Sequence, residues 1–78
     1  MEVGIFNVRL IPGDRPAVAF YDSRYDHTPH GQFVSEYFVE TIEKTTGGLC
    51  LDGGNRDQWT VSPDDMDTVR AFLREVSA

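Results

Sequence analysis

The chain has 78 residues, with 13 acidic and 7 basic side chains and a formal net charge of −6. A chain this short forms one domain with a thin core, taken here as residues 1–78. A hydrophobic content of 40% excludes a disordered tail, and no apolar run approaches the roughly 20 residues of a membrane span. The single cysteine excludes an intramolecular disulfide framework, and the acidic charge argues against phosphate-mediated binding of nucleic acid. With no secretory leader pattern at its start, we expect a cytoplasmic protein.

The first third of the chain predicts an antiparallel hairpin. Residues 3–11 are predicted to form a strand, because apolar side chains alternate with polar ones at the period of a half-buried sheet. Residues 12–16 read Pro-Gly-Asp-Arg-Pro, which is turn chemistry. Residues 17–21 then return as a second strand.

The middle of the chain admits two interpretations. Thr28 and Pro29 form a helix-start signal, and one face of a helix over 29–44 would be apolar. A strand over 32–42 is the alternative, because several of its residues are β-branched. The capping signal favours the helix.

The last third predicts two short strands and a second helix. Strands are expected at 49–51 and 58–61, with a glycine-rich turn between them. Ser62 and Pro63 start the final helix, and Asp65 occupies the capping-box position. The element order is therefore ββαββα. We predict a small α+β domain in which an antiparallel sheet of about four strands carries two helices on one face.

A polar cluster over residues 21–30 holds both histidines. Asp22, Asp26, His27 and His30 have side chains that bind divalent metals, so a small metal- or ligand-dependent enzyme is one hypothesis. The simpler interpretation is an exposed loop, and we expect no metal or cofactor. Cys50 lies between two leucines and is interpreted as buried and inert rather than as a nucleophile.

Three glutamates form the strongest charge pattern. On the predicted helix Glu36, Glu40 and Glu43 are spaced i, i+4 and i+7, which stacks their carboxylates in one exposed stripe. Such a stripe complements a basic protein surface, although an ordinary solvated helix face has the same pattern.

The aromatic side chains are too many for a one-sided core. Most of them are expected to fill it, namely Phe6, Phe20, Phe38, Trp59 and Phe72. Tyr21, Tyr25 and Tyr37, with Arg24, are the interface candidates, because exposed tyrosine beside arginine is typical of binding surfaces. Two small helices cannot cover both faces of the sheet, so we predict a homodimer.

These observations favour a non-enzymatic protein-interaction module that binds a basic protein surface. In size and charge the chain is similar to inhibitors encoded by phages and mobile elements, among them anti-CRISPR and anti-restriction proteins. That likeness implies a nucleic-acid-handling complex as the partner. The alternatives are the small enzyme centred on the histidine loop and a structural dimeric subunit of a larger assembly.

Overall fold

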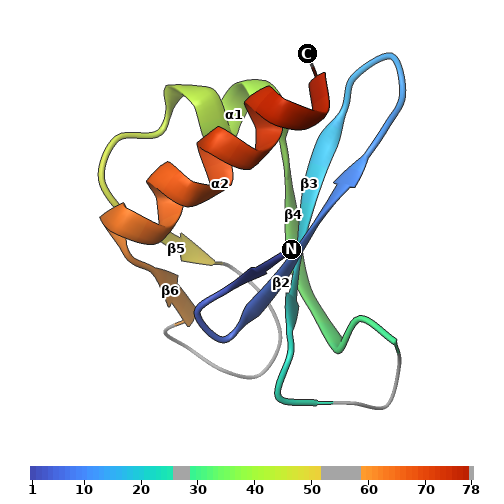
Figure 1. The fold of residues 1–78 in the computed structure, drawn as a ribbon, viewed down its shortest axis with the longest axis vertical. Helices are drawn as coiled ribbons and strands as arrows, with labels where there is room; N and C mark the ends of the chain where they lie inside the picture. The colour runs from blue at the N-terminus through green and yellow to red at the C-terminus, as the bar shows by residue number, and fades with distance from the viewer. Residues whose placement is uncertain (26–28, 52–58, 78) are drawn as a thin grey trace.

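The computed structural model describes residues 1–25, 29–51 and 59–77 (Figure 1). It is a small α+β domain, as the sequence predicts. Its four-stranded antiparallel sheet follows chain order, and a second sheet has two strands. The elements are β1 (Glu2–Val3), β2 (Phe6–Ile11), β3 (Ala17–Asp22), β4 (Gln32–Phe38), α1 (Val39–Lys44), β5 (Leu49–Leu51), β6 (Trp59–Val61) and α2 (Pro63–Ser77).

The predicted hairpin is confirmed as β2 and β3, but its first strand begins at Phe6 and not at residue 3, because residues 4–5 turn the chain back from β1. Their register runs from Phe6 opposite Asp22 to Ile11 opposite Ala17, without interruption. The alternation in β2 sends Phe6 and Val8 into the core and exposes Arg9, which is the period expected of a half-buried strand. Residues 12–16 form the connecting turn.

The predicted helix over 29–44 is wrong over most of its length. Residues 32–38 form β4, which pairs with β3, and the helix begins only at Val39. The strand alternative is correct for 32–38 and wrong for 39–42. Pro29 lies in a turn, and Thr28 falls outside the described residues.

A β-bulge explains why β4 resembles a helix in the sequence. The register of β3 with β4 shifts between Phe20 and Tyr21, and the adjacent residues Val34 and Ser35 are both buried. Two consecutive buried residues break the period-2 alternation that marks a strand. The apolar positions are left at spacings that also suit a helical face.

Because residues 32–38 form a strand, several side chains lie elsewhere than the predicted helix would place them. Glu36 lies on β4 while Glu40 and Glu43 lie on α1, so the predicted stripe along one helix face does not exist. Phe38 was expected in the core, but it is 41% exposed. Phe33 would lie on the apolar, buried face of a helix over 29–44, but in β4 it is 50% exposed.

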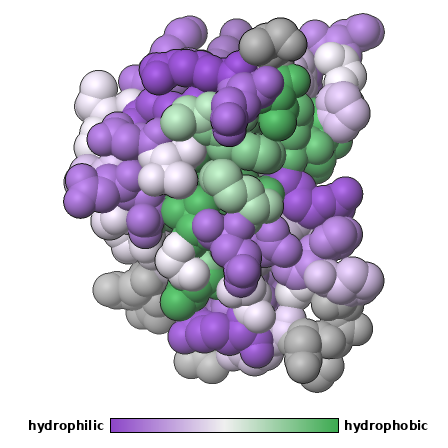
Figure 2. All heavy atoms as spheres, in the orientation of Figure 1, coloured by the Kyte–Doolittle hydropathy of each residue, from purple (hydrophilic) through white to green (hydrophobic). Residues whose placement is uncertain are grey.

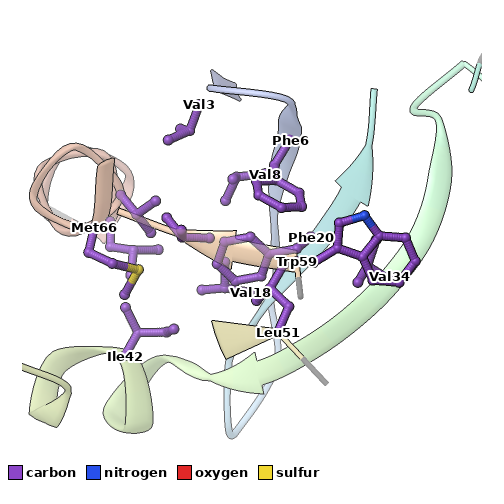
Figure 3. Packing of buried hydrophobic residues seen from close by; sticks show 13 residues of the cluster. Val3, Phe6, Val8, Val18, Phe20, Val34, Ile42, Leu51, Trp59 and Met66 are labelled. Atoms are coloured by element: carbon purple, nitrogen blue, oxygen red, sulfur yellow. The ribbon is translucent and has the colours of Figure 1, made fainter. Parts of the chain in front are cut away.

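The core lies on one face of the four-stranded sheet, under the helices and the second sheet. Figure 1 shows both helices on the same side of β2, β3 and β4. Side chains from the sheet meet Ile42 of α1, Met66 of α2 and Trp59 of β6 (Figure 3). Phe6 and Phe20 pack edge to face, with ring centres 6.3 Å apart. Phe6, Phe20 and Trp59 are thus buried as predicted, and Phe72 is partly buried against the core.

The strands expected at 49–51 and 58–61 form the second sheet, as β5 and β6, rather than extending the first. Residue 58 and the glycine-rich turn expected between these strands lie outside the described residues. Leu49 pairs with Val61 and Leu51 with Trp59. Cys50 points outward and is exposed, so its predicted burial is wrong. In a strand whose flanking leucines turn inward, the residue between them must face solvent.

The predicted start of the last helix is confirmed. The backbone N–H of Asp65 donates to Ser62 Oγ at 3.2 Å, and the N–H of Met66 donates to the Ser62 carbonyl at 2.9 Å.

Figure 2 shows hydrophobic residues at the surface beside the C-terminal end of α2 and toward the β2–β3 hairpin. Within the described ranges, neither helix is long and apolar enough to cross a membrane.

Candidate functional site

A hollow of about 450 Å³ lies between the β2–β3 turn and α1. The backbone N–H of Val39 donates to the carbonyl of Pro16 at 2.9 Å, and this bond ties the start of α1 to the end of the turn. The lining combines apolar side chains with charges of both signs: Asp14, Arg15, Pro16, Val39, Glu40, Glu43 and Lys44. Two of the three glutamates singled out in the sequence therefore border one concave surface.

Arg15 links the turn to both β4 and α1. Its Nε and Nη2 donate to Glu40 Oε1 at 3.0 and 2.6 Å, and its guanidinium carbon lies 3.8 Å from the ring centre of Phe38. The hydrogen bonds from Arg15 lower the pKa of Glu40. Both charged side chains are exposed, so water screens the pair and it adds little to stability. Its effect is to hold Arg15 over the Phe38 ring.

A second, smaller hollow of about 240 Å³ includes Phe38 in its lining. Its wall comes from β3, β4 and α1: Ala17, Glu36, Tyr37, Phe38 and Thr41. Glu36 and Tyr37, both predicted to bind a partner, line this hollow. Tyr37 is half-buried, however, and its ring packs edge to face on Phe20 of the core, with ring centres 6.2 Å apart. Residues 32–44 carry three glutamates against one lysine, a local net charge of −2. The junction of a strand with a helix, rather than a helical face, brings these glutamates to neighbouring hollows.

Tyr21 belongs to a separate aromatic cluster at the other end of β4. Its ring centre lies 5.7 Å from those of both His30 and Phe33. Phe33 and Glu36 are three strand residues apart, which is about 10 Å. The aromatic cluster and the hollows thus occupy different ends of the sheet. The sequence did not identify Phe33 as a binding residue, although its place directly opposite Tyr21 follows from the strand register.

Arg24 is held by a buried carboxylate. Asp22 is fully buried, and it accepts hydrogen bonds from the Nε, Nη2 and backbone N–H of Arg24 at 3.0, 2.8 and 3.0 Å. The side-chain bonds from Arg24 are the largest cause of a lowered Asp22 pKa, and the indole N–H of Trp59 lowers it further. This network joins the end of β3 to β6. Arg24 itself remains 57% exposed, and Tyr25 beside it is half-buried.

The proposed metal ligands are not gathered into a site by the described residues. The oxygens of Asp22 already bind Arg24 and Trp59, and His30 packs on Tyr21. Asp26 and His27 fall outside the described residues. Across 1–25, 29–51 and 59–77, no three histidine, cysteine, aspartate or glutamate side chains are placed to hold a metal ion together. A ligand role for Asp22 would require breaking its bonds to Arg24.

Comparison of the chain with protein-family models, with curated proteins and with solved structures found no match. A candidate function for this fold therefore rests on the geometry and charge of its own surface.

Proposed function

We propose that the chain is a non-enzymatic interaction module that binds a basic protein surface at the hollow between the β2–β3 turn and α1. The observation that carries this proposal is a concave, partly apolar surface lined by three carboxylates against two basic side chains: Asp14, Glu40 and Glu43 against Arg15 and Lys44. A basic side chain entering the hollow would meet these carboxylates and the apolar surfaces of Pro16 and Val39.

The local charges support a cationic partner. Both hydrogen bonds from Arg15 reach the same oxygen of Glu40, Oε1, and within the described residues no bond reaches Oε2. Glu43 forms no ion pair with any described residue. These oxygens are available to a guanidinium or ammonium group, and charge complementarity of this kind raises association rates as well as specificity.

The chain's overall charge of −6 also favours association with a basic surface. Basic protein surfaces are characteristic of proteins that handle nucleic acid, because phosphate binding requires them. We therefore propose a nucleic-acid-handling complex as the partner class. Occupying its basic surface would make the chain an inhibitor of the kind that phages and mobile elements encode.

The test uses a fluorescein-labelled 15-residue peptide in which arginine alternates with leucine, and measures its anisotropy with the folded protein. We expect binding that weakens as salt rises from 50 to 300 mM, because the Debye length shortens over this range. The double variant Glu40→Lys/Glu43→Lys should lower the affinity at least tenfold at the lower salt concentration.

A matched control separates this site from general acidity. Glu2→Lys/Glu75→Lys makes the same change in net charge at two exposed glutamates on β1 and α2. It should lower the affinity far less than the α1 variant does. Equal loss in the two variants, or unchanged affinity in the α1 variant, would show that the hollow is not the binding site.

A further inference from the structure

The four-stranded sheet has a second face, opposite the helices, that the described elements leave uncovered (Figure 1). The strand register places the side chains of this open face in three rows that cross β2, β3 and β4. The rows are Ile11–Ala17–Phe38, Arg9–Ala19–Glu36 and Asn7–Tyr21–Phe33. Each row therefore has a small or aromatic residue on β3 at its centre.

The middle row carries two opposite charges on either side of an alanine. Arg9 and Glu36 are both exposed, and neither forms an ion pair with any described residue. They are two strand spacings apart, about 10 Å, with Ala19 between them. Ala17 and Ala19 are small, and Ala19 is fully buried between its neighbours, so the flanking side chains of β2 and β4 make the contacts with another sheet.

We propose that a second copy of the chain covers this open face, related to the first by a two-fold axis that runs along β3 between the two sheets. Rotation about such an axis brings β2 of one copy over β4 of the other. Arg9 of each copy then lies opposite Glu36 of its partner, so the interface contains two pairs of opposite charge and each charge is paired once.

The charges select this axis among the symmetric arrangements. A two-fold axis perpendicular to the strands and passing through the middle row would set Arg9 against Arg9 and Glu36 against Glu36. Like charges facing each other across an interface disfavour association. The axis along the strands also agrees with aligned sheet packing, in which two sheets lie about 10 Å apart with strands within roughly 30° of each other.

The outer rows supply apolar contact in the same arrangement. Ile11, 39% exposed, comes to lie opposite the partner's Phe38, which is 41% exposed although Arg15 lies over its ring, and Tyr21 meets its own counterpart at the axis. Strands of this length give the face a footprint of about 20 by 15 Å, which is small for a specific interface. We therefore expect dissociation constants on the order of 1–100 µM.

This interface goes beyond the proposed function and uses different residues. It takes Glu36 for self-association and leaves Glu40 and Glu43 at the α1 hollow for the partner. The two ideas can fail separately, because one is read from oligomeric state and the other from peptide binding.

The deciding experiment is rescue between two charge variants, followed by sedimentation velocity from 5 to 500 µM. The wild type should shift from monomer to dimer within this range. Arg9→Glu alone sets glutamate against glutamate in a homodimer, and Glu36→Arg alone sets arginine against arginine, so each should remain monomeric. An equimolar mixture of the two variants should dimerise, because both cross-interface pairs become attractive in the heterodimer.

Controls for this experiment lie on α2, away from the open face. Arg74→Glu and Glu75→Arg change exposed charges in the same way and should leave the monomer–dimer equilibrium within twofold of the wild type. Circular dichroism of each variant checks that it is folded. The proposal is overturned if the wild type stays monomeric throughout, if the single variants dimerise like the wild type, or if the folded mixture stays monomeric.

Discussion

The buried carboxylate of Asp22 offers the sharpest test of how this small fold is stabilised. Replacing it with asparagine keeps the shape but converts one acceptor oxygen into a donating amide. Leaving the buried indole N–H of Trp59 without an acceptor lowers the free energy of unfolding by about 1–3 kcal/mol. The charge-assisted bonds to Arg24, whose side chain is 57% exposed, add to this loss. We expect Asp22→Asn to lower the free energy of unfolding by about 2 kcal/mol or more.

That loss is large for a chain of this size. At roughly 0.05–0.15 kcal/mol per residue, the whole fold has a stability of about 4–12 kcal/mol. Urea unfolding followed by the fluorescence of Trp59, the single tryptophan, and by circular dichroism measures the change. With a slope near 1 kcal/mol per molar for a small domain, the midpoint should fall by about 2 M or more.

The chain contains its own control for burial. Asp67 accepts a hydrogen bond from Arg70 Nη1 at 3.0 Å, yet its side chain is 77% exposed. Asp67→Asn makes the same chemical change to an aspartate paired with arginine and should cost less than about 0.5 kcal/mol. A loss for Asp22→Asn no larger than that of Asp67→Asn would refute the reasoning that burial makes the Asp22 network important.

Two further predictions concern the same end of the sheet. Since the folded pKa of Asp22 is lowered from an unfolded value of about 3.9, its stabilising effect is complete above about pH 5 and is lost as pH falls through 3.9 toward the folded pKa. The urea midpoint should therefore drop more steeply between pH 5 and pH 3 in the wild type than in Asp22→Asn, and parallel curves would contradict this. Gly31→Ala should destabilise by about 3 kcal/mol or more, because φ is +99° and a Cβ would overlap the backbone carbonyl of Asp22. Gly47→Ala, with φ +74° and open space around the added atom, should cost only about 1 kcal/mol in the same urea assay, and equal costs would exclude the steric explanation.

Signals within a few residues were enough to predict the hairpin and the last helix. Alternating apolar and polar residues around a proline-glycine turn predict the β2–β3 hairpin. Ser62 followed by proline and an acidic first turn predicts α2. Both patterns report local backbone preferences that the tertiary structure preserves. The exposure of Cys50 was also within reach, since alternation between two inward leucines already implies it.

The strand β4 could not be read from local signals because pairing with β3 overrides them. Its bulge places Val34 and Ser35 on the buried side together, and this spacing is shared with a helix. A helix-start signal at Pro29 serves a turn instead. Pairing of this kind depends on a partner strand about ten or more residues away, so the short sequence patterns that predict a helix or a strand do not report it.

The candidate site was also predictable only in part. The charge pattern of the sequence indicated Glu36, Glu40 and Glu43, but their grouping around two hollows depends on the junction of β4 with α1. The charges of Arg9 and Glu36 are visible in the sequence, whereas their position in one row across Ala19 requires the register.

The strand order β1-β2-β3-β4 has a consequence for how the chain reaches this structure. Every strand of the large sheet pairs with its neighbour in sequence, so each can add to an edge that the preceding strand has just formed. Short loop closures of this kind carry little entropic cost and favour rapid folding. The sheet can thus assemble as a growing meander, and the helices and second sheet complete its one-sided core afterwards.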